Sequence, residues 1–107
     1  MAGPSPDGLS YLLDDSPNSF ALTPGFLTPY PNGLFALGGN DFIVGSSDAE
    51  IISGDNGNDR ILGGSNSDTL LGGVGNDLLN GGASSDIMFG DVGSDTLQGG
   101  RGEDALN

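Results

Sequence analysis

A carboxylic acid recurs every nine residues over the last two thirds of this chain. The positions are Asp41, Glu50, Asp59, Asp68, Asp77, Asp86, Asp95 and Asp104. Two residues after each acid comes an apolar side chain, in the series Ile43, Ile52, Ile61, Leu70, Leu79, Met88, Leu97 and Leu106. A glycine lies five residues before each acid from Glu50 onward. Three residue types that share one register predict a repeat architecture.

The unit GGVGNDLLN (72–80) indicates how each repeat folds. Its glycines permit the positive φ that tight turns need, and the three residues after the acid alternate outward, inward and outward. Stacked copies would bury the middle residue and form parallel sheets with about 4.8 Å between layers. Two loops and two strands make one turn of 18 residues. The sequence therefore predicts an all-β fold, a parallel β-roll or two-sheet solenoid of about four turns, preceded by a non-repeat N-terminal segment.

Prolines and glycines divide the chain. All six prolines precede residue 32, and 17 of the 21 glycines follow residue 35. We therefore expect a proline-rich, extended or turn-rich segment at 1–35 and the β-roll at 36–107. The aromatic side chains of the segment predict that it packs, as an N-terminal cap on the roll or as an assembly arm on a neighbour; a partly ordered linker is the alternative. Asn32 and Leu34 share the nine-residue register, so a degenerate first repeat is expected to begin there.

The net charge and the residue composition limit the kinds of ligand that this chain can bind. Fifteen acidic residues face two basic ones, and the formal net charge is −13, which disfavours nucleic acid as a partner. No apolar run is long enough to span a membrane. Without His or Cys, zinc, copper and haem sites are disfavoured, whereas carboxylate and carbonyl oxygens suit calcium.

Acids that are 18 residues apart would stack in successive turns, so the eight acids form two columns. The first contains Asp41, Asp59, Asp77 and Asp95, and the second contains Glu50, Asp68, Asp86 and Asp104. Like charges one layer apart repel by about 1 kcal/mol in water and by more near a protein surface, so a cation is expected between successive loops. Four loops per side leave three gaps per side, which predicts up to six calcium ions. Glycine–aspartate turns that hold no metal are the alternative.

The two columns differ two residues before each acid. The first column has glycine throughout, at Gly39, Gly57, Gly75 and Gly93, whereas the second has Asp48, Asn66, Ser84 and Gly102. Asp55 and Asp91 add further carboxylates on the first side. We therefore predict better calcium sites in the first column and the weakest site between the loops of Glu50 and Asp68.

The units GDNGNDRIL, GGVGNDLLN and GGRGEDALN resemble the nonapeptide of the RTX (repeats-in-toxin) family, GGxGxDxUx. The resemblance covers roughly residues 36–107. It implies a calcium-filled parallel β-roll of the kind found in proteins that are exported unfolded by type I secretion. The N-terminus lacks the pattern of a secretory signal peptide, so we expect export without a cleaved N-terminal signal and a location outside the cell or at its surface.

No catalytic motif such as HExxH or GxSxG is present, and we expect no enzymatic activity. Outward strand positions carry apolar residues, namely Phe42, Val44, Ile51, Leu62, Leu71, Leu78, Ile87 and Phe89, and the last repeat has no polar cap. These features predict a structural or assembly module that self-associates or binds another protein through its outward apolar residues and its C-terminal end. The outward apolar residues could instead be scattered surface hydrophobics without a partner. The alternative for the function is a calcium-responsive folding or secretion domain of a longer secreted enzyme, toxin or adhesin.

Overall fold

The computed structural model describes residues 3–4, 8, 10–14, 16–27, 30 and 33–107, and Asn32 lies outside them. These residues form strands, and none of them form a helix. The described chain therefore contains no helix that could cross a membrane. The strands are β1 (Gly3–Pro4), β2 (Ser10–Leu12), β3 (Ser19–Ala21), β4 (Gly33–Phe35), β5 (Phe42–Val44), β6 (Ile51–Ser53), β7 (Arg60–Leu62), β8 (Thr69–Leu71), β9 (Leu78–Asn80), β10 (Ile87–Phe89), β11 (Thr96–Gln98) and β12 (Ala105–Leu106).

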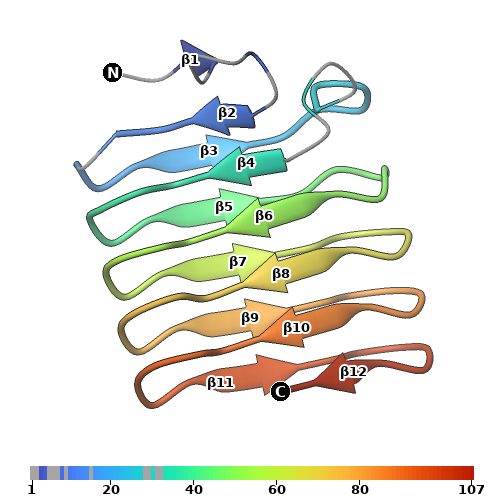
Figure 1. The fold of residues 1–107 in the computed structure, drawn as a ribbon. Coiled ribbons are helices and arrows are strands. Elements are labelled where there is room, and N and C mark those ends of the chain that lie inside the picture. The colour runs from blue at the N-terminus through green and yellow to red at the C-terminus, as the bar shows by residue number, and fades with distance from the viewer. Residues whose placement is uncertain (1–2, 5–7, 9, 15, 28–29, 31–32) are drawn as a thin grey trace.

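The chain winds as a solenoid whose successive strands alternate between two sheets (Figure 1). One sheet has the order β1-β2-β4-β6-β8-β10-β12, and the other has the order β11-β9-β7-β5-β3. Apart from the antiparallel pair β1 and β2, neighbouring strands run parallel. In the repeat region the partners are 18 residues apart, as Ile43 and Ile61 illustrate. The predicted parallel β-solenoid of about four 18-residue turns is confirmed.

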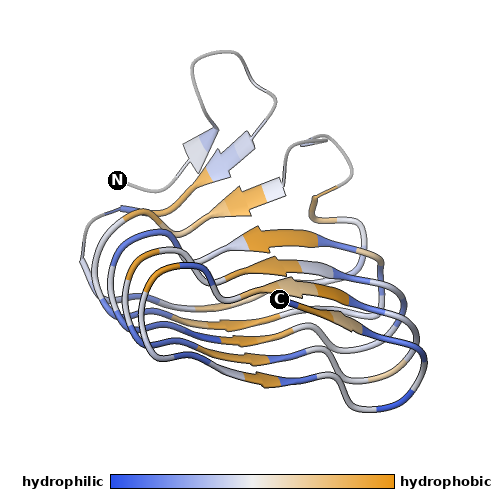
Figure 2. Cartoon of the chain, turned by 60° about the horizontal axis from the view of Figure 1, so that its bottom comes forward, coloured by the Kyte–Doolittle hydropathy of each residue, from blue (hydrophilic) through white to orange (hydrophobic). Residues whose placement is uncertain are grey.

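The inward column of apolar residues forms the core. Apolar residues colour the strands orange, while the connecting loops are mostly blue or white (Figure 2). The fully buried members are Leu34, Ile43, Ile52, Ile61, Leu70, Leu79 and Met88. Leu97 is partly buried and Leu106 is 49% exposed, so the predicted core column is fully enclosed only as far as Met88. Each enclosed side chain contributes about 1.5–3 kcal/mol through burial, which ties every strand to the layers on either side of it.

Strands β2 and β3 add a further layer in front of the repeats. Tyr11 pairs with Leu34 and Phe20 pairs with Ile43, so both sheets extend into the N-terminal segment. The rings of Tyr11 and Phe20 stack with centroids 6.0 Å apart, and Phe26 and Tyr30 lie 5.0 and 5.4 Å from Tyr11. These four rings, the aromatic cluster, pack at the N-terminal end of the core. The division of the chain at residue 35 stays a prediction.

This first layer has a different spacing from the repeats. Equivalent residues such as Asn18 and Asp41 are 23 positions apart, against 18 for Asp41 and Asp59. Tyr11 and Phe20 occupy the middle of β2 and β3 at the usual nine-residue spacing. The five additional residues therefore lie in the connection from β3 to β4, which carries Phe26 and Tyr30 into the aromatic cluster.

Candidate metal centre

The acids of the repeats form two hydrogen-bonded ladders. In the first column the backbone N–H groups of Asp41, Asp59 and Asp77 each donate to Oδ1 of the aspartate 18 residues later, at 2.8, 2.7 and 2.8 Å. In the second column the donors are the N–H groups of Glu50, Asp68 and Asp86, and the acceptors are Asp68, Asp86 and Asp104. Each carboxylate therefore reaches back toward the preceding layer. The structure brings all eight predicted acids into the two predicted columns.

The second carboxylate oxygen of these aspartates lacks a protein partner. Oδ2 is buried and accepts no hydrogen bond within the described chain in Asp41, Asp59, Asp68, Asp77 and Asp86. These residues are only 1–3% exposed. A buried, unpartnered carboxylate oxygen is unfavourable, and a cation is the group that would complete it.

Burial also changes how these carboxyl groups titrate. Desolvation is the main cause, and it raises the pKa of Asp59 to about 7, of Asp68 to about 8 and of Asp77 to about 6. The charges of neighbouring acids in the same column raise these pKa values further. Without a counter-ion, the surroundings of the ladders therefore favour the protonated carboxyl groups over the ionised ones.

The glycine five residues before each acid makes room for its carboxylate. A Cβ added at Gly63 would lie 2.6 Å from Oδ2 of Asp68, and one at Gly72 would lie 2.6 Å from Oδ2 of Asp77. Real Cβ atoms do not approach an oxygen so closely. This packing explains the glycine column that the sequence shows, and it keeps Oδ2 enclosed by main chain.

Main-chain oxygens stack beside the first carboxylate column. Gly57, Gly75 and Gly93 have φ of +113°, +128° and +122°, a region that L side chains rarely adopt. A Cβ on any of them would collide with the carbonyl oxygen of the glycine one layer earlier, namely Gly39, Gly57 or Gly75. Among the described residues, no group of three or more carboxylates lies close enough together to hold a metal ion by itself. A calcium ion would therefore combine single carboxylates with backbone oxygens, a set of ligands that calcium accepts.

An asparagine ladder distinguishes the first column from the second. The N–H groups of Asn58, Asn76 and Ser94 donate to the side-chain oxygens of Asn40, Asn58 and Asn76 at 2.8, 2.8 and 2.9 Å. On the second side the corresponding bond runs from Glu103 N–H to Ser85 Oγ at 3.2 Å. The acid, glycine and apolar positions of the repeat do not predict this ladder, but the sequence carries a signal for it, because asparagine directly precedes the acid in three successive first-column repeats.

The loop of Glu50 departs from the other loops. Both oxygens of Glu50 accept the N–H of Ser46, at 2.9 and 3.1 Å, and the Ser46 hydroxyl also donates to Glu50. Its carboxylate is thus satisfied within its own loop. Gly64 and Asn66 in the next loop have φ of +92° and +64°, whereas their counterparts Ser46 and Asp48 do not take positive φ.

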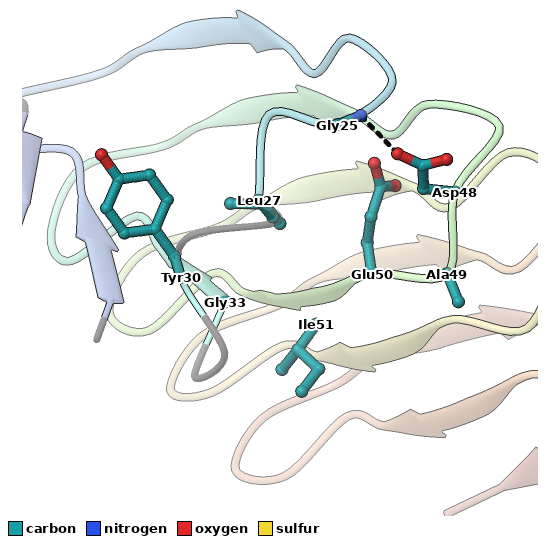
Figure 3. Close-up of a pocket in the computed structure, with 8 residues that line it drawn as sticks. All are labelled: Gly25, Leu27, Tyr30, Gly33, Asp48, Ala49, Glu50 and Ile51. Atoms are coloured by element: carbon teal, nitrogen blue, oxygen red, sulfur yellow. Dashed lines mark hydrogen bonds between the residues drawn. The ribbon is translucent and has the colours of Figure 1, made fainter. Parts of the chain in front are cut away.

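Asp48 bonds instead to the connection between β3 and β4. Its carboxylate accepts the N–H of Gly25, marked by the dashed line in Figure 3. Asp48 and Glu50 line a pocket of about 410 Å³ together with Leu27, Tyr30 and Ile51. Asp48, which stands where the repeat pattern has glycine, therefore already bonds to another part of the protein.

The two additional carboxylates of the first side differ from each other. Asp55 accepts the N–H of Leu37 at 3.2 Å and the Ser53 hydroxyl at 2.8 Å. Asp91 is exposed, and its charge is one of the smaller causes that raise the pKa of Asp77. Asp55 therefore already joins two loops, whereas Asp91 adds negative charge beside the column.

Stacked parallel strands, carboxylate ladders and unpartnered carboxylate oxygens define the class of calcium-binding β-solenoids. The family model of the RTX calcium-binding nonapeptide repeat matches residues 34–61, 62–97 and 81–107, and the chain belongs to this family. The comparisons with curated proteins and with solved structures gave no match. The resemblance drawn from the nonapeptides is confirmed.

Proposed function

We propose that this chain is a non-catalytic, calcium-binding β-roll that folds when it binds calcium and serves as a structural or assembly module outside the cell. The five buried aspartate Oδ2 atoms without a partner are the observation that carries the proposal. Membership of the RTX family supports it, because this repeat is a calcium-binding structural motif and occurs in secreted proteins.

Calcium would bind between successive loops of each column. On the first side the acids Asp59, Asp77 and Asp95, the carbonyls of Gly39, Gly57, Gly75 and Gly93, and the nearby carboxylates of Asp55 and Asp91 are the proposed ligands. When bound, calcium supplies positive charge and oxygen coordination that the ladders lack. The second side, with Asp68, Asp86 and Asp104, would bind more weakly because the asparagine ladder supports only the loops of the first side. The gap between Glu50 and Asp68 would bind most weakly, since Ser46 already satisfies Glu50.

Circular dichroism tests the coupling of folding to calcium. The free energy of each turn includes the cost of ordering glycine-rich loops and of burying carboxylates, and an ion that binds only the folded form offsets both. We expect little β signal in excess chelator and a cooperative gain of β signal at millimolar calcium, with magnesium much less effective. The same β signal in chelator and in calcium would contradict the proposal.

Exposed apolar side chains support the assembly role. Phe42, Ile51 and Ile87 are 37%, 38% and 45% exposed. Ile51 and Ile87 flank Thr69 on the same outward row of one sheet. We propose that this row contributes to self-association of the calcium-loaded roll. Light scattering with and without calcium tests this idea, with the double variant Ile51→Thr/Ile87→Thr as a comparison; a monomer at high concentration in calcium would refute it.

A further inference from the structure

The carboxylate of Asp41 faces a gap that lies outside the nonapeptide repeats. Its Oδ1 accepts the N–H of Asn18 at 2.7 Å, so the group reaches toward the layer of β3 and away from Asp59. Asp59, Asp77 and Asp95 reach toward their preceding layers in the same way. Those three carboxylates therefore serve the three gaps inside the repeats, and Asp41 serves a fourth gap on the same side.

The far wall of this gap is formed by Asp14 and residues 16–18, which stack on the following loop as the repeat loops do. Asn18 directly precedes β3, and its carbonyl accepts the N–H of Phe42 at 2.8 Å, as the carbonyl of Asp41 accepts that of Arg60. A Cβ added at Gly39 would lie 2.8 Å from the carbonyl oxygen of Ser16. At Gly57 the nearest atom is the carbonyl oxygen of Gly39, whereas at Gly39 the carbonyl carbon of Ser16 is slightly nearer than its oxygen, so the stack of peptide groups continues into the N-terminal layer.

The fourth gap also contains a second carboxylate. Asn18 replaces the acid of the repeats, but Asp14 lies four residues before it, as Asp55 lies before Asp59. Oδ1 of Asp14 accepts the N–H of Ser16 at 3.0 Å and the side-chain amide of Asn18 at 3.1 Å, which holds the carboxylate in the loop. Asn18 links the two carboxylates, because its backbone N–H bonds to Asp41 and its side-chain amide bonds to Asp14. Oδ2 of Asp41 is buried and unpartnered in the described chain, in a residue that is 3% exposed.

We propose that Asp14 and residues 16–18, together with the loop at residues 36–41, hold a further calcium ion, bound by the carboxylates of Asp41 and Asp14 and by the carbonyl oxygen of Ser16. The inference rests on the proposed calcium binding of the roll. Asp14 and residues 16–18 lie outside the residues that match the RTX repeat, so no nonapeptide motif assigns this site. Its ion joins the N-terminal layer to the first repeat, and it adds one to the six ions that the repeats alone predict.

Tyrosine fluorescence gives this site a local signal. The chain has no Trp and two Tyr, and both of them, Tyr11 and Tyr30, belong to the aromatic cluster of the N-terminal layer. Calcium titrations of the full chain followed by tyrosine fluorescence therefore report this layer, while circular dichroism reports the whole roll. Native mass spectrometry counts the bound ions.

Asp14→Asn is the test variant, and Glu103→Gln is the control with the same change of charge at an exposed site. In Asp14→Asn we expect one ion fewer and a tyrosine midpoint at about tenfold more calcium, with the circular dichroism midpoint nearly unchanged. Glu103→Gln should match the wild type in all three measurements. Asp14→Ser, which keeps an acceptor for Ser16 N–H, should behave like Asp14→Asn and guards against a purely structural loss.

The outcomes separate the two proposals. If the wild type binds no calcium, calcium binding by the roll fails together with this site. If the wild type binds calcium but Asp14→Asn and Asp14→Ser keep the full number of ions and the wild-type tyrosine midpoint, only the further site is refuted.

Discussion

Removal of calcium should make the stability of the roll fall as the pH rises from 5 to 8. In the calcium-free fold, burial raises the pKa of Asp59 to about 7, of Asp68 to about 8 and of Asp77 to about 6. The unfolded chain ionises these groups near 3.8, so the folded state binds more protons at neutral pH. Below about pH 4 these carboxyl groups are protonated in both states, and the folded chain keeps its full stability. This stability is lost as the pH rises through the pKa values of the folded state.

The size of this effect decides whether the fold survives without calcium. Each unit of pKa shift corresponds to about 1.4 kcal/mol, so Asp59 alone accounts for about 4 kcal/mol at pH 8. The raised pKa values of Asp68 and Asp77 lower the stability at pH 8 in the same direction. A domain of this length has a total stability of roughly 5–15 kcal/mol. The calcium-free roll should therefore be largely unfolded at pH 8 and should regain structure toward pH 5.

Circular dichroism and urea denaturation of the calcium-free chain between pH 5 and pH 8 provide the assay. Lower pH is avoided because the isoelectric point is about 4.1. In saturating calcium the trend should reverse, because the ion binds the ionised carboxylates. Stability that is constant or rises with pH in the calcium-free chain would refute the argument that burial leaves these carboxylates without a counter-charge.

Asp68→Asn sharpens the same test. The amide oxygen can still accept the N–H of Glu50, which Oδ1 accepts at 2.9 Å in the wild type, but the side chain cannot ionise. At pH 8 the variant should be more stable than the wild type without calcium, by roughly 5 kcal/mol. In calcium the order should be reversed, since a charged ligand has been removed.

Three further outcomes are expected. Asp77→Ala should raise the calcium midpoint of folding more than Glu50→Ala, because Ser46 already satisfies Glu50; equal shifts in a circular dichroism titration would contradict this difference. Gly75→Ala should destabilise the calcium-loaded roll by about 2 kcal/mol or more in thermal melts, since its φ is +128° and the Gly57 carbonyl occupies the place of a Cβ. Ile61→Ala, at a fully buried position, should lower the free energy of unfolding in urea by about 2–5 kcal/mol without changing the number of ions per folded chain.

The repeat register was predictable because one period governs both packing and charge. The inward residue lies two positions after the acid, so a shift of one residue would expose the Ile and Leu column and bury polar neighbours. The same register places Asp59 over Asp41 and Asp68 over Glu50, which is why both columns could be derived from spacing alone. The orphaned Oδ2 atoms follow from the glycines that surround them, and only the coordinates reveal that enclosure.

The N-terminal layer was not predictable in detail because its spacing breaks the period. The connection from β3 to β4 adds five residues, so Phe20 pairs with Ile43 at a separation of 23. Asn18 also takes the position at which every repeat loop has an acid, so this loop lacks the mark that identifies the others. The protein contacts of Asp48 and Glu50 depend on that same connection and on Ser46, whose roles no nine-residue pattern reveals.

The carboxylate ladders have a direction, and this direction gives the N-terminal layer its importance. In the first column each acid accepts the N–H of the layer before it, so every layer positions the carboxylate of the next one. Glu50, at the start of the second column, is instead held by Ser46 of its own loop. Asp41 begins the first ladder, and its own donor is Asn18, a neutral residue in a layer held together by aromatic packing. The N-terminal layer therefore presents the N–H group that positions Asp41, and each later layer of the column presents the N–H group that the next carboxylate accepts.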